Sequence, residues 1–104
     1  MKKVSFVIPC YRSAQTLPHV VKEINDTMSR MKDYCYEIIM VNDCSPDDTF
    51  ATIEKLCAES ENRPQAQRKG INLAKNFGQH SALMAGFHYV TGDIVVCLDD
   101  DGQT

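Results

Sequence analysis

Four short runs of apolar, β-prone residues alternate along this chain with segments whose apolar residues recur at helical spacing. Strands that alternate with helices are typical of parallel sheets built from crossover units, and such crossovers are right-handed. Near-continuous apolar strands indicate a sheet that is covered on both faces. The pattern therefore predicts an α/β fold, a three-layer α/β/α arrangement with a mainly parallel four-stranded sheet. The predicted strands are 4–8, 37–41, 70–74 and 94–98.

The segments between these runs are expected to be three helices. The second has the clearest start signal, with Ser45 as the cap, Pro46 at the first helical position and an acid at the third. We interpret Asp47 and Asp48 as charges that favour this helix start. We interpret His80 as a helix-start residue. The residues expected to face the core are Leu17, Val20, Val21, Ile24, Met28 and Met31, then Phe50, Ile53, Leu56 and Cys57, then Leu83, Met84 and Phe87.

Length, charge and cysteine usage narrow the class of protein. A chain of 104 residues is one domain at most, and its net charge of -3 without a dominant basic patch argues against nucleic acid as a partner. No run approaches the roughly 18 apolar residues of a spanning helix, and no secretory signal is recognisable. The cysteines form no C-x-x-C pair, which predicts reduced, mostly buried thiols in a soluble intracellular domain. They are Cys10, Cys35, Cys44, Cys57 and Cys97.

Three consecutive acids, Asp99, Asp100 and Asp101, follow the last apolar run directly. In an extended segment, side chains two positions apart share a side, so Asp99 and Asp101 can converge on one point. Oxygen ligands of this kind suit a hard divalent cation. A solvated acidic turn is the alternative, but the position after a buried-type strand favours a ligand site.

Polar residues also follow each of the other predicted strands. Because the carboxyl ends of parallel strands lie on one edge, these four segments are expected to form one crevice. The chain has neither a P-loop nor a G-x-G-x-x-G fingerprint, which excludes a P-loop hydrolase and a dinucleotide-binding protein of that type. A divalent ion usually takes part of its ligands from substrate phosphate, so a phosphorylated ligand is expected. The segments are Pro9 to Arg12, Asn42-Asp43, Lys75-Asn76 and Asp99 to Asp101.

Three ordered segments, VSFVIPCYRS, EIIMVNDCSPDDT and NFGQHSALMAGFHYVTGDIVVCLDDDGQ, resemble family 2 glycosyltransferases with a GT-A fold. Within that family the chain is most similar to the polyprenyl-phosphate group, which includes dolichol-phosphate mannose synthases and undecaprenyl-phosphate glucosyl or aminoarabinose transferases. The resemblance covers nearly the whole chain. It implies that residues 1–104 are the Rossmann-like, nucleotide-sugar-binding N-terminal part of a glycosyltransferase domain, ending after the D-x-D motif.

The resemblance also implies roles for individual residues. Tyr11 matches the wall of the nucleotide pocket, and Asp43 matches the acid that hydrogen-bonds the base. The implied cofactor is Mg²⁺ or Mn²⁺, bridging to the donor diphosphate, with Asp99, Asp101 and Gln103 as its ligands. The implied nucleotide-binding residues are Pro9, Tyr11, Ser13, Asp43, Lys75, Asn76, Asp99 and Asp100.

The implied reaction is inverting sugar transfer from a UDP- or GDP-linked donor to an acceptor such as a polyprenyl phosphate, in the biosynthesis of cell-envelope polysaccharide. The acceptor-side residues lie outside the chain, so its catalytic residues are not identified, and the fragment alone is expected to transfer little or no sugar. The parent protein is expected at the cytoplasmic face of the membrane. Cut after its fourth strand, the fragment is expected to self-associate through an exposed sheet edge near Asp93 to Leu98.

Departures from the family pattern leave two alternatives open. Arg12-Ser13 stands where the family usually has Asn-Glu, and Asn42 where a second acid is common, which favours a non-catalytic nucleotide-binding module. The run from Leu98 to Gly102 also resembles the D-x-D-G nucleophile loop of haloacid-dehalogenase-type phosphatases, with Asp99 as the nucleophile. Against that alternative, the threonine that should follow the glycine comes one residue late.

Overall fold

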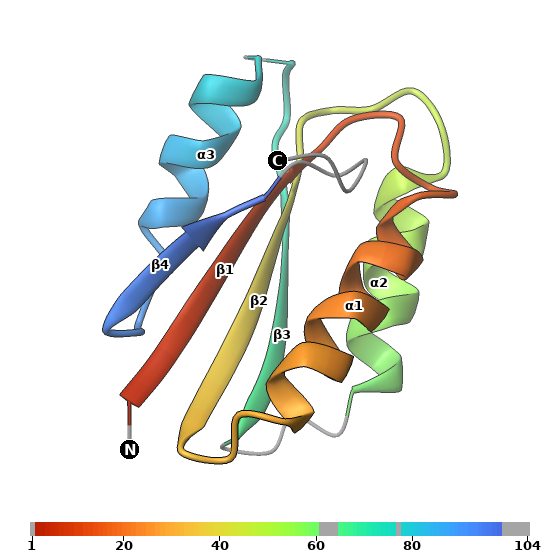
Figure 1. Cartoon of the computed structure of the whole chain (residues 1–104). Coiled ribbons are helices and arrows are strands. Elements are labelled where there is room, and N and C mark those ends of the chain that lie inside the picture. The colour runs from red at the N-terminus through yellow and green to blue at the C-terminus, as the bar shows by residue number, and fades with distance from the viewer. Residues whose placement is uncertain (1, 61–64, 77, 99–104) are drawn as a thin grey trace.

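The computed structural model describes residues 2–60, 65–76 and 78–98. Strands and helices alternate throughout, as predicted (Figure 1). In the part of the chain so described, no helix has the length and apolar character needed to cross a membrane. The elements are β1 (Lys2–Cys10), α1 (Leu17–Ser29), β2 (Tyr34–Asn42), α2 (Thr49–Glu59), β3 (Ala66–Asn72), α3 (Gln79–Phe87) and β4 (Ile94–Cys97).

The four strands form one sheet in the order β3-β2-β1-β4, and every neighbouring pair is parallel. Helices α1 and α2 cover one face of this sheet and α3 covers the other, which gives the predicted three layers (Figure 1). Strand β1 lies inside the sheet, where Val7 pairs with Ile39 of β2 and with Cys97 of β4. Strand β4 lies at one edge.

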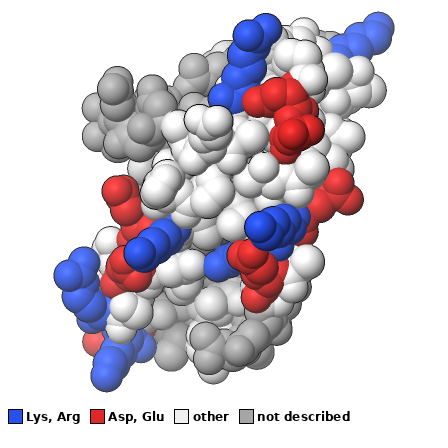
Figure 2. Space-filling model, turned by 90° about the vertical axis from the view of Figure 1, so that its right-hand side faces the viewer, with Lys and Arg blue, Asp and Glu red and all other residues white. Residues whose placement is uncertain are grey.

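Two apolar cores lie on the two faces of the sheet, because successive residues of β1 and β2 point to opposite sides. Ile8 and Met40 belong to the core under α1 and α2, and Val7 and Ile39 to the core under α3. All four side chains are fully buried. The outer surface over α1 and α2 carries basic and acidic side chains interspersed, as expected of a solvated face (Figure 2).

Helix α3 packs through a different face from the one predicted. Met84 and Phe87 were expected in the core but are 50% and 40% exposed. The buried residues are Ala82 and Gly86 instead. A Cβ on Gly86 would lie 2.5 Å from Cγ1 of Val7, so a small residue is required for the helix to approach β1. The prediction followed the large apolar residues, whereas the close contact is made by small ones.

Other boundaries also differ from the prediction. Helix α2 begins at Thr49 and not at Ser45–Pro46, because the hydroxyl of Ser45 is bonded to a neighbouring loop. Strand β3 begins at Ala66, since its backbone pairing with β2 starts there although residues 67–69 are polar. Met31 lies beyond the end of α1 and is 40% exposed.

The cysteines are all free thiols, as predicted, but they are not mostly buried. Only Cys10 is fully buried, in β1. Cys35 and Cys57 are half-buried, and Cys44 and Cys97 are exposed. The two exposed thiols lie at the carboxyl ends of strands, where loops and an edge strand face solvent.

Candidate functional site

The carboxyl ends of β1, β2 and β3 meet at one edge of the sheet, as the sequence predicted. The amide of Asp43 donates a hydrogen bond to the carbonyl of Cys10 at 3.0 Å, and the amide of Leu73 donates to the carbonyl of Asn42 at 2.9 Å. The side-chain amide of Asn42 donates to Oδ1 of Asn72 at 2.8 Å. The three loops that follow these strands are therefore held together where they leave the sheet.

The first of these loops exposes an aromatic ring and a cation. Tyr11 is 40% exposed, and the guanidinium carbon of Arg12 lies 5.6 Å from the centroid of its ring, a cation–π arrangement. Arg12 has a φ of 54°, in the left-handed region that non-glycine residues rarely adopt. Pro9 is buried within β1 opposite Val41. Tyr11 and Arg12 are therefore exposed at the start of this loop, directly after β1.

Ser13 shapes the same loop from inside. Its side chain is 1% exposed, and its hydroxyl accepts a hydrogen bond from the amide of Tyr11 at 3.0 Å and donates to the Tyr11 carbonyl at 3.1 Å. Its own amide donates to the hydroxyl of Thr49 at 2.9 Å. A direct contact between Ser13 and a nucleotide stays a prediction.

Asp47 anchors the first loop to the second. The amide of Arg12 donates to the hydroxyl of Ser45 at 2.9 Å. The hydroxyls of Ser45 and Thr49, and the amide of Thr49, all donate to Oδ1 of Asp47. The bonds from Ser45 and then Thr49 lower the pKa of the Asp47 carboxyl below its usual value. We call Ser45, Asp47 and Thr49 the hydroxyl clamp. It gives Asp47 a specific loop-anchoring role that the interpretation as helix electrostatics missed.

Asp43 links the second loop to the third. The residue is 3% exposed, and its Oδ2 accepts a hydrogen bond from the amide of Gly78 at 3.0 Å. The adjacent Cys44, which also has a left-handed φ of 53°, donates its thiol to the carbonyl of Ala74 at 3.6 Å. The carboxylate predicted to bind the base is therefore held by backbone from the loop after β3.

Lys75 and Asn76 are exposed in the loop between β3 and α3. Oδ1 of Asn76 accepts a second hydrogen bond from the amide of Gly78, at 3.1 Å. Gly78 has a φ of 92°, a conformation that suits glycine. Both predicted residues are thus at the same edge of the sheet as Asp43.

The predicted metal ligands and one predicted nucleotide contact lie outside the described residues: Asp99, Asp100, Asp101 and Gln103. The amide of Leu98, which precedes them, donates to the carbonyl of Val7 at 3.1 Å, so the described chain ends beside β1 near the carboxyl edge. Among the residues that the structure does describe, no three His, Cys, Asp or Glu side chains are grouped so as to hold a metal ion.

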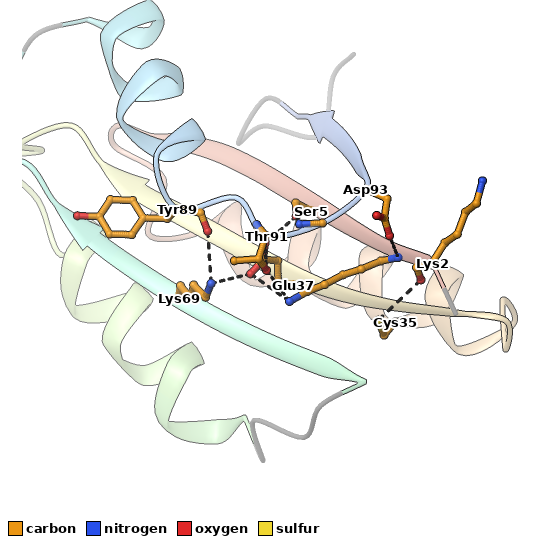
Figure 3. A network of polar contacts seen from close by, with 10 residues as sticks. Lys2, Ser5, Cys35, Glu37, Lys69, Tyr89, Thr91 and Asp93 are labelled. Atoms are coloured by element: carbon orange, nitrogen blue, oxygen red, sulfur yellow. Dashed lines mark hydrogen bonds and ion pairs between the residues drawn. The ribbon is translucent and has the colours of Figure 1, made fainter.

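A polar network that the sequence reading missed lies near the opposite end of the sheet (Figure 3). Glu37 of β2 is completely buried. Its Oε2 accepts hydrogen bonds from the hydroxyl of Ser5 at 2.6 Å and from the amide of Thr91 at 2.7 Å. Its Oε1 lies 2.7 Å from Nζ of Lys69 and 3.7 Å from Nζ of Lys3. The signal was visible as Ser5 and Glu37, two polar residues within apolar runs.

The ionised form of Glu37 is strongly favoured. Burial by itself would raise the pKa of this carboxyl. The bonds from Lys69, Ser5 and Thr91 outweigh burial and lower the pKa from 4.5 to about 2. The carboxylate is therefore charged at any physiological pH.

Two solved structures have a similar fold. The mannosyltransferase PcManGT from Pyrobaculum calidifontis, in complex with GDP-Man and Mn²⁺, matches with a TM-score of 0.78 at 24% identity over 96% of this chain and 28% of that chain. Residues 1–349 of TarS from S. aureus, in complex with UDP-GlcNAc, match with a TM-score of 0.72 at 23% identity over 95% of this chain and 26% of that one. The fold is therefore the Rossmann-like fold of GT-A glycosyltransferases, as expected.

Curated relatives have the name undecaprenyl-phosphate 4-deoxy-4-formamido-L-arabinose transferase. The protein from Sodalis glossinidius (strain morsitans) is 44% identical over 101 residues, which are 97% of this chain and 29% of that protein. The protein from Yersinia enterocolitica serotype O:8 / biotype 1B is 39% identical over 103 residues, 99% of this chain and 30% of that protein. The chain thus spans less than a third of the length of these relatives.

The sequence profile described as Glycosyl transferase family 2 matches residues 5–104, which include β1 from Ser5 onward, the strand-end loops and β4. This match leaves the haloacid-dehalogenase alternative without support. It agrees with the resemblance carried by the three sequence segments and with the fold of the solved neighbours. The chain belongs to glycosyl transferase family 2.

Proposed function

We propose that residues 1–104 bind the nucleotide-diphosphate sugar donor of a glycosyltransferase that transfers the sugar, with inversion, to a polyprenyl phosphate. The observation that carries the proposal is the convergence of three strand-end loops at one edge of the sheet, linked by the bonds of Asp43 and Asn42. The names of the curated relatives support the acceptor class. The GDP-Man and UDP-GlcNAc complexes of the structural neighbours support the donor class.

The first two loops offer groups suited to a nucleoside. The exposed ring of Tyr11 supplies a flat apolar surface for stacking, with the Arg12 guanidinium beside it. The carboxylate of Asp43 is an acceptor for an N–H group of a base, and its bond from Gly78 fixes its orientation before any ligand arrives. Lys75 adds an exposed cation at the same edge for the anionic part of the donor.

The proposed ligands of Mg²⁺ or Mn²⁺ are Asp99, Asp101 and Gln103. All three would bind through oxygen: the two aspartates through a carboxylate and Gln103 through its side-chain amide oxygen. Oxygen ligands of this kind fit a hard divalent cation. They follow Leu98 in sequence, and the Leu98 amide is bonded to β1 near the carboxyl edge. When bound, the cation supplies Lewis-acid stabilisation of the leaving diphosphate.

The acceptor side of the reaction is assigned to polypeptide outside this chain. The aligned relatives are more than three times as long, since the chain covers 29% and 30% of them. A polyprenyl phosphate is already an anion at neutral pH, so its attack on the anomeric carbon requires no general base from residues 1–104. We therefore propose that the fragment binds donor but transfers little or no sugar, and that the whole protein acts at the cytoplasmic face of a membrane.

A pair of matched variants tests the proposal. Asp101→Ala removes a proposed metal ligand, whereas Asp33→Ala removes an exposed acid from the turn before β2, near the other end of the sheet. Binding of UDP and GDP is measured by calorimetry with Mn²⁺ and with EDTA. Metal-dependent binding that is lost in Asp101→Ala and kept in Asp33→Ala is the expected result. Nucleotide binding that is equal with Mn²⁺ and EDTA, in both variants, contradicts the metal site and favours the non-catalytic alternative.

A further inference from the structure

The Glu37 network has no part in the proposed donor site, yet it contains a carboxylate that is completely buried. A buried carboxylate is destabilising unless it is paired and hydrogen-bonded, and an apolar residue of similar size often serves stability as well. The partners of Glu37 come from three separate segments: Ser5 on β1, Lys69 on β3, and Thr91 in the α3–β4 turn (Figure 3). The Glu37 carboxylate connects the sheet to the α3–β4 turn, which an apolar residue at this position could not do.

Three consecutive backbone amides of the turn are bound to the sheet. The amide of Thr91 donates to Glu37 at 2.7 Å, and the amide of Gly92 donates to the hydroxyl of Ser5 at 2.8 Å. The amide of Asp93 donates to the carbonyl of Lys3 at 2.8 Å, and the Lys3 amide donates back to Oδ2 of Asp93 at 3.0 Å. The turn therefore has a defined position along β1 before β4 begins.

Gly92 seats the turn directly on β1. A Cβ at this position would lie 2.4 Å from Oγ of Ser5 and 2.8 Å from the carbonyl oxygen of Lys3. Neither distance is possible for a real Cβ, and the second neighbour is backbone, which cannot swing away. Any side chain at this position would push the turn off the sheet.

Strand β4 has little else to hold its register. It is four residues long, and among the described strands it pairs only with β1, from Ile94 opposite Val4 to Cys97 opposite Val7. Ile94 and Val95 remain 40% and 44% exposed, and only Val96 and Leu98 pack, partly buried, against the core under α1 and α2. Side-chain burial therefore specifies the alignment of β4 less strongly than that of β1 and β2. The turn bonded to Glu37 and Ser5 is the feature that defines where β4 starts.

Register matters here because three identical acids follow β4. A slip of one residue would move Asp100 into the place of Asp99 or Asp101. Residues 94–98 are all apolar, so after such a slip apolar side chains would still face the core. We propose that Glu37 is a positioning residue: by holding Thr91, with Gly92 seated on Ser5, it sets the register of β4 and thereby determines which acids are presented to the metal and diphosphate. The effect on metal and diphosphate binding rests on the proposed function, whereas the effect of Glu37 on the register of β4 does not.

Two variants that release the turn by different routes test the inference. Glu37→Met removes the acceptor for Thr91, and is combined with Lys69→Met because the Lys69 ammonium lies 2.7 Å from Oε1. Lys3, whose Nζ is 3.7 Å from Oε1, is left in place because it also donates to the hydroxyl of Thr91. Gly92→Ala keeps the Glu37 charges paired and displaces the turn by steric contact alone. Glu37→Gln, which retains an oxygen acceptor for Thr91, is the conservative control.

The first measurement is hydrogen exchange of the backbone amides of residues 94–98, compared with those of β2. In both release variants we expect faster exchange in residues 94–98 with β2 protection unchanged, and native exchange in Glu37→Gln. Native protection of residues 94–98 in both release variants would overturn the inference. This arm needs no ligand, so it remains decisive even if the proposed function is wrong.

The second measurement is Mn²⁺-dependent binding of UDP or GDP with Asp100→Ala and Asp101→Ala introduced in turn. In the native background we expect Asp101→Ala to weaken binding about tenfold more than Asp100→Ala. In folded release variants this difference should shrink to about twofold or less, while Glu37→Gln keeps it. A merely structural role of Glu37 would lower stability and leave the difference intact, and that result would overturn the positioning role. No metal-dependent binding in the native chain would instead refute the proposed function.

Discussion

The carboxylate of Asp43 and the amide of Gly78 are 35 positions apart in the chain and 3.0 Å apart in space. Their hydrogen bond joins the loop after β2 to the loop after β3, where the donor nucleotide is proposed to bind. Asp43 is 3% exposed, so this bond is made in a poorly solvated place and contributes to both order and stability. One residue thus serves the fold and the proposed base contact together.

The two roles of Asp43 can be separated by substitution. Asp43→Asn keeps an oxygen acceptor for Gly78, so we expect the free energy of unfolding to fall by no more than about 1 kcal/mol. Asp43→Ala leaves the Gly78 amide without this partner and is expected to cost about 1–3 kcal/mol. Both variants should lose nucleotide affinity, which calorimetry on the folded proteins would show. If Asp43→Asn bound the nucleotide with native affinity, the charge of Asp43 would not be needed for the proposed base contact.

The hydroxyl clamp makes a second prediction, with a neighbouring acid as its control. Asp47→Ala removes the acceptor for Ser45 and Thr49 and loosens the attachment of the first loop through Arg12. Because Asp47 is exposed, we expect a loss of only about 1 kcal/mol in urea unfolding. Asp48, at the start of α2, makes no capping bond with its side chain. Asp48→Ala should cost less than about 0.5 kcal/mol, and an equal loss in both variants would contradict the clamp.

Glu37 predicts how stability depends on pH. Its pKa is lowered from 4.5 to about 2 in the folded state, so its contribution is fully present above pH 4.5 and is lost as the pH falls toward 2. The full loss is on the order of 3 kcal/mol. The free energy of unfolding, measured in urea between pH 7 and pH 3, should therefore decrease less steeply in Glu37→Gln than in the native chain. Parallel pH profiles for the two proteins would show that the carboxylate is not preferentially stabilised by folding.

The edge strand predicts self-association of this chain. Strand β4 pairs only with β1 among the described strands, and Val95 is 44% exposed on it. An open edge of this kind invites pairing with another chain, and a lysine on it discourages pairing. In sedimentation velocity we expect concentration-dependent association that Val95→Lys reduces and Met31→Lys does not, since Met31 is 40% exposed but lies away from the edge. A monomer at every concentration would contradict this prediction.

The local sequence pattern was sufficient to predict the strands, the helices and the parallel sheet, but not all the contacts between a helix and the sheet. Alternating strand and helix signals predicted the parallel α/β order and the common edge of the loops after β1, β2 and β3. Each signal is local, and the right-handed crossover rule then places successive strands in parallel in one sheet. The buried face of α3 was predicted wrongly. Ala82 and Gly86 pack against the sheet because only small residues fit at this close contact, whereas the prediction used hydrophobicity alone.

Long-range polar contacts were beyond the sequence reading. Glu37 and Thr91 are 54 positions apart, and the sequence around either residue does not indicate that the two form a hydrogen bond. Asp47 was read as a helix charge, because its bonds to Ser45 and Thr49 depend on α2 starting later than the start signal indicated. Both errors concern side chains whose partners only the folded chain brings within reach.

The central claim, that this chain carries a metal-dependent donor site, is tested most directly by titrating the unmodified protein with UDP and with GDP, each in Mn²⁺ and in EDTA. The account predicts that at least one nucleoside diphosphate binds with Mn²⁺ and that EDTA abolishes the binding. The nucleotide that binds then identifies the base of the donor. Absence of binding by both nucleotides, in a sample whose circular dichroism and cooperative unfolding show it to be folded, would contradict the claim.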